Sequence, residues 1–215
     1  MILGMISTHP LALRVVLVVA AVWPCPSRAQ DPEPRLGGGD GITYFIAPSG
    51  GVAGSQPGDE GLAVAALTAW ARLASPALEL VPAAEDAALV RVYWLPAGAG
   101  LYGETRGREV RGRRGADVFV HPDTDALGGD IAVAARADAL FRDTVVYLTC
   151  VHELGHAFGL EHTASFADIM YSFVYGGDLL AYFMRFREKL RRREDLAAAS
   201  PFSAADLRAF EALYP

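Results

Sequence analysis

The sequence predicts a single α+β domain, from its length, its composition and the order of its secondary-structure patterns. The chain has 215 residues, of which 52% are hydrophobic and 20% charged, which suits a globular protein with a substantial core and argues against disorder. Apart from one early helix, β-branched and aromatic stretches dominate from residue 42 to about residue 135. Helical patterns dominate from about residue 140 to the end.

The first 29 residues are predicted to be a secretory signal peptide. Arg14 precedes an apolar run at 15–23, and Ser27 and Ala29 satisfy the small-x-small rule for cleavage after residue 29. A membrane anchor is the alternative, but this run is too short to cross about 30 Å of hydrocarbon as a helix. The protein is therefore expected to be secreted, extracellular or periplasmic, without a stable membrane anchor.

Residues 30–41 are then a Pro/Gly-rich leader, and residues 42–215 form the domain. The formal net charge of −6 argues against nucleic acid as the main partner. Cleavage removes Cys25 and leaves Cys150 as the only cysteine, so no intrachain disulfide is expected. The domain is expected to be a monomer whose stability comes from its core and its metals.

Five strands and one long loop are expected before the main helical region. The loop, rich in glycine and arginine, is placed at 97–115. The predicted strands are 42–47, 78–83, 88–97, 116–121 and 130–135.

Four helices are predicted, at 60–75, about 140–159, roughly 178–199, and 203–214, the last capped by Ser203. The helix at 178–199 has an apolar stripe that should face the domain, with basic residues on its other faces. The basic residues are interpreted either as a solvated face or as a contact for anions or membranes. The stripe is Leu179, Phe183, Phe186 and Leu190, and the basic residues are Arg185, Arg187, Lys189, Arg191, Arg192 and Arg193.

The stretch "HELGHAFGLEH" contains the candidate metal ligands and a candidate general base. His152 and His156 are separated by one helical turn, so both imidazoles project from one face and can bind one ion. Gly159 accepts the left-handed conformation that ends a helix, which lets the chain bring His162 back to the metal. Three protein ligands leave a fourth position of zinc open for water, and Glu153 can take the proton of that water.

Coincidence is the alternative to a metal site. With the residue frequencies of this chain, the pattern arises by chance with a probability below roughly 10⁻⁴. A purely structural zinc site normally has four protein ligands. Cys150 points to another side of the helix and is expected to pack in the core.

These motifs resemble those of the metzincin clan. "HELGHAFGLEH" is similar to its extended zinc signature HExxHxxGxxH. "ADIMYS" is similar to the methionine turn, with Met170 eight residues after His162, as in the matrixins. "GGDIAV" (128–133) resembles the turn into the strand before the active-site helix, and "FSAADLRAFEALY" (202–214) resembles the matrixin terminal helix.

The resemblance implies a metzincin (zincin-like) fold, with a twisted mixed sheet, an active-site helix, a methionine turn and a C-terminal helix. The sheet would be mostly parallel with one antiparallel edge strand, and the helix at 178–199 would be an insertion. Met170 would form an apolar floor beneath the metal, and Asp206 would brace the methionine turn.

The resemblance also implies a zinc-dependent endopeptidase in which Glu153 is the general base. A protein or peptide substrate would bind as an extended strand along a sheet edge near 116–127. Two alternatives stay open: a zinc-binding protein without catalysis, and a processing protease of narrow specificity.

One catalytic zinc is expected. The structural zinc of the family needs histidines on the strands that flank the Gly-Gly-Asp turn, but Ala132 stands at one such position and His121 is alone. Asp123, Asp125 and Asp130 offer oxygen ligands for a possible calcium ion. The alternative interpretation is a solvated turn that uses these aspartates for its backbone hydrogen bonds.

Overall fold

The computed structural model describes Leu36, residues 41–96 and residues 102–215, all within one compact unit at 34–215. The predicted signal peptide and almost all of the predicted leader lie outside the described residues. In the described part of the chain, no helix has the length and apolar character needed to cross a membrane.

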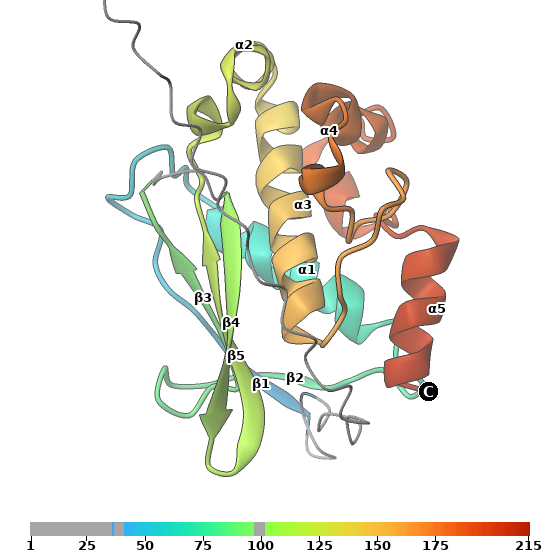
Figure 1. Cartoon of the computed structure of the whole chain (residues 1–215). Helices are drawn as coiled ribbons and strands as arrows, with labels where there is room; N and C mark the ends of the chain where they lie inside the picture. The colour runs from blue at the N-terminus through green and yellow to red at the C-terminus, as the bar shows by residue number, and fades with distance from the viewer. Residues whose placement is uncertain (1–35, 37–40, 97–101) are drawn as a thin grey trace, which may run out of the picture. The chain divides into compact units, whose positions relative to one another are not determined.

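A five-stranded sheet forms one layer of this unit (Figure 1). Its strand order is β2-β1-β3-β5-β4, in which the edge strand β4 is antiparallel to β5 and the other neighbours are parallel. The predicted mixed sheet with one antiparallel edge strand is therefore confirmed. The strands are β1 (Ile42–Ile46), β2 (Leu80–Pro82), β3 (Val90–Trp94), β4 (Gly103–Val110) and β5 (Arg113–Val120).

Five α-helices and three short 3₁₀ helices complete the fold within the described residues, and α3 packs on β4, β5 and α1. The hydroxyl of Ser203 accepts the N–H groups of Ala205 and Asp206, which confirms the predicted cap of the last helix. The α-helices are α1 (Asp59–Ala71), α2 (Gly129–Ala137), α3 (Ala139–Ala157), α4 (Leu179–Arg187) and α5 (Ala204–Leu213). The 3₁₀ helices are η1 (Thr124–Leu127), η2 (Phe173–Tyr175) and η3 (Arg193–Ala197).

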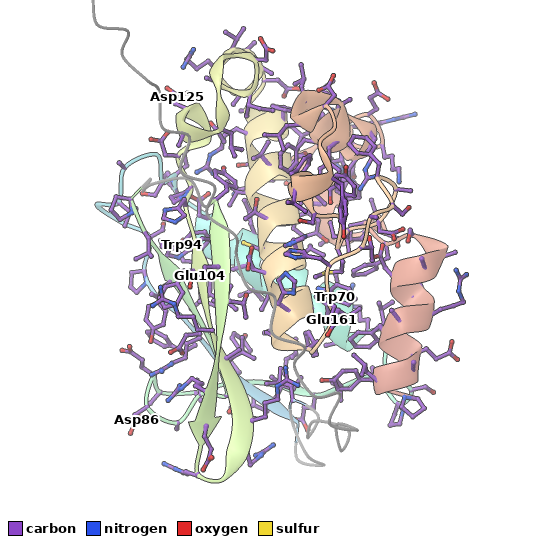
Figure 2. The ribbon with its side chains drawn as sticks, viewed as in Figure 1. Trp70, Asp86, Trp94, Glu104, Asp125 and Glu161 are labelled. Carbon is purple, nitrogen blue, oxygen red and sulfur yellow. The ribbon has the colours of Figure 1, made fainter. Side chains whose placement is uncertain are left out.

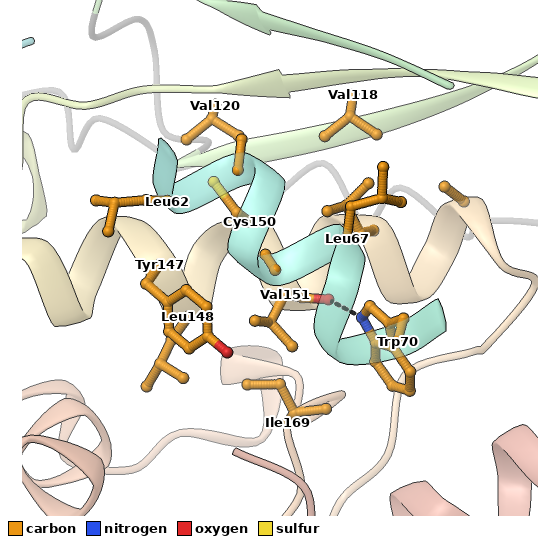
Figure 3. Packing of buried hydrophobic residues seen from close by; sticks show 14 of the residues in the cluster. Leu62, Leu67, Trp70, Val118, Val120, Tyr147, Leu148, Cys150, Val151 and Ile169 are labelled. Carbon is orange, nitrogen blue, oxygen red and sulfur yellow. Dashed lines mark hydrogen bonds between the residues drawn. The ribbon is translucent and has the colours of Figure 1, made fainter. Parts of the chain in front are cut away.

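The core lies where α1 and α3 cross beneath the sheet (Figure 3). The indole N–H of Trp70 on α1 donates to the main-chain oxygen of Val151 on α3 at 2.7 Å. Cys150 is completely buried, so the prediction that it packs in the core is confirmed. Since α3 carries two of the three motif histidines, this packing fixes their position relative to the sheet.

A buried ion pair joins the first turns of α1 and α3. Arg142 contacts the carboxylate of Asp59 through both terminal nitrogens, with Nη2 2.8 Å from Oδ2, and the two side chains are 3% and 0% exposed. Nη2 of Arg142 also donates to the main-chain oxygen of Gly54 at 2.7 Å. The pair therefore locks the start of α3 onto α1 and onto the loop that precedes α1.

The loop predicted at 97–115 is wrong for most of its length. Residues 103–110 form β4 and pair with β5 through a two-residue turn in which Arg111 and Gly112 both have positive φ angles, of 52° and 77°. Such turns match the twist of a hairpin. Charged and glycine residues resemble a loop in composition, but an edge strand tolerates them because one of its sides faces solvent.

The strand predicted at 130–135 is also wrong, because these residues lie in α2. The segment is rich in alanine, the strongest helix former, and Asp130 and Arg136 complement the helix dipole in its first and last turns. The strand that precedes α3 in the chain is β5, so "GGDIAV" is not the turn that its resemblance suggested. The apolar alternation was too short to separate the two structures.

The single helix predicted at 178–199 is two elements, α4 and η3. The carboxylate of Asp195 accepts the N–H groups of Arg191 and Arg192, at 2.8 and 3.1 Å, so these groups do not continue α4. The predicted apolar stripe does face the domain, since Phe183, Phe186 and Leu190 are buried.

The basic residues of this region do not form one outward ridge. The guanidinium of Arg185 contacts the main-chain oxygen of Phe166 and lies over the ring of Tyr182. Arg187 pairs with Asp138, and Arg193 lies 2.9 Å from the carboxylate of Asp143. These three arginines therefore attach α4 and η3 to the rest of the domain.

Candidate metal centre and active-site cleft

Three imidazoles converge at the end of α3. His152 and His156 come from α3, and His162 comes from the loop that follows it. The Nε2 atom of His162 lies 3.2 Å from Nε2 of His152 and 3.1 Å from Nε2 of His156. Among the described residues, these three form the one group of at least three His, Cys, Asp or Glu side chains able to share a metal ion.

Hydrogen bonds on the far side of two rings decide which nitrogen faces the centre. Nδ1 of His152 lies 2.7 Å from the oxygen of Ile169, and Nδ1 of His156 lies 2.8 Å from the oxygen of Leu160. Because a carbonyl oxygen only accepts, each Nδ1 carries the proton and each Nε2 presents a lone pair.

These convergent lone pairs fit a zinc ion. They repel each other unless a cation lies between them. Tetrahedral zinc with ligands at about 2.0–2.1 Å would place the nitrogens about 3.3–3.4 Å apart, close to the observed spacing.

Gly159 ends α3 as predicted, with a φ of +99°. Its N–H donates to the oxygen of His156, and the N–H of Leu160 donates to the oxygen of Gly155. The left-handed conformation turns the chain sharply, which places His162 opposite the two helical histidines. A side chain at this position would be strained whatever the surrounding space.

The turn that holds Met170 lies directly under α3. Met170 is 1% exposed, and a Cβ atom on Gly155 would clash with its sulfur, so glycine is what lets the methionine approach the helix. The carboxylate of Asp206 accepts the N–H of Ile169 at 2.9 Å and that of Ser203 at 2.8 Å. Asp206, in the first turn of α5, thus joins this helix to the turn.

Glu153 is nearly buried, at 7% exposure, and points toward the edge strand β4. Its Oε2 atom accepts a hydrogen bond from the hydroxyl of Thr105 at 2.8 Å. Burial raises the pKa of Glu153 to about 7, although the hydrogen bond from Thr105 acts in the opposite direction. A group with such a pKa exchanges protons readily near neutral pH.

The three histidines and Glu153 line a cleft of about 820 Å³. One wall comprises residues of β4 and β5, and the other comprises α3, the segment after the methionine turn, and α4. The edge expected near 116–127 is wrong, because β5 is an interior strand and β4 forms the edge. Residues of the second wall include Leu148, Thr149, Phe173, Val174, Leu179, Tyr182 and Phe183.

Sequence reasoning missed three contributors to this site. Gly103 and Thr105 lie in the segment expected to be a loop, and Tyr182 lies in the helix expected at 178–199 but was given no role at the site. The hydroxyl of Tyr182 donates to the oxygen of Ile169 at 3.0 Å, the same oxygen that orients His152. The alternation of small and charged residues in "GETRG" (103–107) was the available signal for a strand here.

Two of the three aspartates considered for calcium have other partners. The carboxylate of Asp123 accepts the N–H of Asp125. Asp125, which is labelled in Figure 2, pairs with Arg136 at 2.8 Å, and both side chains are exposed. Asp130 lies in the first turn of α2. These contacts agree with the alternative of a turn stabilised by its own side chains, and calcium binding is not shown.

Comparison with known families is consistent with this geometry. The matrixin family model matches residues 104–179, from β4 through the methionine turn to the first residue of α4. The match leaves out β1, β2, β3, α1 and α5, and no curated protein matches the sequence. The described sheet and helices fit the matrixin fold, and the match supports a zinc metalloprotease in general terms.

Proposed function

We propose that this protein, whose residues 104–179 match the matrixin family model, is a secreted zinc-dependent endopeptidase of the matrixin-like metzincin type. The observation that carries the proposal is the placement of the Glu153 carboxylate in the same cleft as three convergent imidazoles. A site that only stored a metal would have no need of a buried carboxylate that contributes no ligand.

His152, His156 and His162 would hold the zinc, and their Nε2 atoms are its ligands in the proposal. When bound, zinc supplies a positive charge that acts as a Lewis acid toward the scissile carbonyl and toward water. The main-chain oxygens of Ile169 and Leu160 keep two of the imidazoles in the tautomer that can bind it.

Glu153 moves the proton. Its carboxylate takes a proton from the attacking water as the oxygen bonds to the carbonyl carbon. It then gives that proton to the leaving nitrogen as the C–N bond breaks. Proton uptake and proton release both suit a group whose pKa lies near neutrality.

The substrate would bind as an extended strand beside β4. This strand is at the edge of the sheet, so the main-chain groups on its outer side have no neighbouring strand within the sheet. The cleft runs between β4 and α3, so a peptide bound on that edge would lie over the histidines and Glu153. The chain is proposed to act as a monomer on proteins or peptides, with no role for nucleic acid.

Cleavage of casein or gelatin by purified protein tests this function. Hydrolysis that a zinc chelator stops and that added zinc restores supports it. Zinc binding with no hydrolysis of any protein in the panel, or of a peptide library, would favour the non-catalytic alternative. Cleavage of a single sequence in the library would favour the narrow processing role.

A further inference from the structure

The face of β4 that lies over α3 has one side chain near Glu153. Alternation along the strand directs positions 103, 105 and 107 toward the helix, and the positions between them away from it. Arg106 follows this pattern, since its guanidinium lies over the ring of Phe119 on the other face. Two of the three inward positions are glycine, so Thr105 alone among them carries a functional group.

Gly103 allows the close approach of Glu153 to the strand. A Cβ atom on Gly103 would lie 2.5 Å from Oε1 and 2.8 Å from Cδ of Glu153, too close for two non-bonded atoms. The carboxylate therefore rests against the bare backbone of β4. Its position is defined by the sheet as well as by the helix that carries it.

Thr105 then fixes the orientation of that carboxylate. Its Oγ1 atom lies 2.8 Å from Oε2 of Glu153 and 2.8 Å from the main-chain oxygen of Glu153. The threonine side chain branches at Cβ and has few rotamers, so its hydroxyl is held in place. We propose that Thr105 is a positioning residue that holds Glu153 in the orientation needed for proton transfer. The inference rests on the proposed peptidase function.

The hydroxyl of Thr105 has one proton, so it donates to one of the two oxygens at a time. While it donates to Oε2, the Oε1 atom is the carboxylate oxygen left to take the proton of the attacking water and to pass it to the leaving nitrogen. The bond to Oε2 therefore holds the carboxylate without occupying the oxygen that transfers the proton.

Thr105→Val removes the hydroxyl and keeps the branched shape, whereas Thr105→Ser keeps the hydroxyl. The expected result is a loss of kcat of about 10- to 100-fold in the valine variant, since misplacing a reacting group by about 1 Å can cost that much. The KM value should stay within a few-fold of the parent's. The serine variant should recover most of kcat, and zinc content should be unchanged in both variants.

Thr144→Val is the matched control, because Thr144 is buried in α3 and its hydroxyl binds only the oxygen of Leu140 among the described contacts. If the valine variant folds poorly, Thr105→Ala supplies the same comparison. A kcat within two-fold of the parent in a zinc-loaded variant without the hydroxyl overturns the proposal. A loss of kcat in Thr105→Val that is equally large in Thr105→Ser also overturns it.

The parent protein and Glu153→Ala, measured alongside, separate the two proposals. Chelator-sensitive hydrolysis that Glu153→Ala abolishes establishes the peptidase function, whatever the Thr105 variants do. Absence of hydrolysis in the zinc-loaded parent overturns both the function and the role of Thr105.

Discussion

The main-chain oxygen of Ile169 lies 2.7 Å from Nδ1 of His152 and 3.0 Å from the hydroxyl of Tyr182. One carbonyl group in the methionine turn therefore links the first motif histidine to α4. The N–H of the same residue donates to Asp206. The geometry of the histidine cluster thus depends on a turn that α4 and the capping region of α5 hold from two sides.

The first prediction concerns the metal. Purified protein should contain one zinc ion per chain, and His156→Ala should lose it because two imidazoles leave zinc short of ligands. Elemental analysis of dialysed protein measures this directly. His121→Ala is the control, since Nδ1 of His121 lies 2.7 Å from the oxygen of Pro96, and His121 is not among the three clustered histidines. Full zinc content in the His156 variant would contradict the ligand assignment.

The second prediction concerns the general base. Glu153→Gln should bind zinc normally and lose about 10²–10⁴-fold in kcat, because the amide cannot take the proton. Steady-state hydrolysis of a fluorogenic peptide, with zinc content measured on the same sample, gives both numbers. Turnover close to that of the parent would show that another group activates the water.

The third prediction concerns the contact between Gly103 and Glu153. Gly103→Ala should reduce kcat, because the added methyl group would displace the carboxylate. Gly107→Ala is the comparison on the same face of β4, where a Cβ atom meets nothing within 4 Å. The expected order of kcat is parent, then Gly107→Ala, then Gly103→Ala. The reverse order of the two variants would show that the close approach has no functional role.

The fourth prediction concerns pH. Burial lowers the pKa of His152 to about 4 and also lowers the pKa of His156. In the unfolded chain these imidazoles titrate near about 6.5. Between these values the unfolded state binds more protons than the folded state, so the free energy of unfolding falls as the pH falls from about 6.5 to about 4.

Thermal unfolding of chelator-treated protein across this range measures the dependence. Other groups also titrate in acid, so the informative quantity is the difference from His152→Gln, which has no imidazole at this position. The melting temperature of the variant should fall less on acidification than the melting temperature of the parent. Parallel curves for the two proteins would rule out the contribution of His152.

The fifth prediction concerns the buried ion pair. Arg142→Ala should lower the free energy of unfolding by about 3–5 kcal/mol, because it leaves the carboxylate of Asp59 buried without its partner. Arg191→Ala, at an exposed position, should change it by less than about 0.5 kcal/mol. Urea titration, monitored by circular dichroism, measures the free energy of unfolding of both variants. Equal stability of the two variants would mean that other groups compensate for the loss of Arg142.

The zinc motif could be predicted from the sequence because its geometry is local. The two helical histidines are one turn apart, and Gly159 turns the chain back within three residues, so spacing alone defines the cluster. The mixed sheet followed from the resemblance and was correct. The bounds of the early strands were correct to within a few residues.

Glu153 and Thr105 show why the rest could not be predicted. They are 48 residues apart in sequence, and their contact depends on the pairing of β4 with β5 and on the packing of α3 against that hairpin. The composition of β4 suggested a loop because its outward side chains are charged. At 130–135, the apolar alternation was too short to exclude a strand, whereas the alanine content and the charges in the first and last turns favour a helix.

The two edge strands of the sheet also affect how readily copies of the protein associate with one another. An enzyme that binds peptides along a free sheet edge also exposes that edge to other copies of itself. The outer edge β2 is three residues long and ends in Pro82, which has no N–H group to pair with another strand. The other edge, β4, along which a substrate is proposed to bind, cannot be blocked in that way, and its outward side chains Glu104, Arg106 and Arg108 are charged. Such charges disfavour edge-to-edge pairing with another copy of the sheet, which leads to aggregation. The main-chain groups of β4 stay accessible to a single peptide.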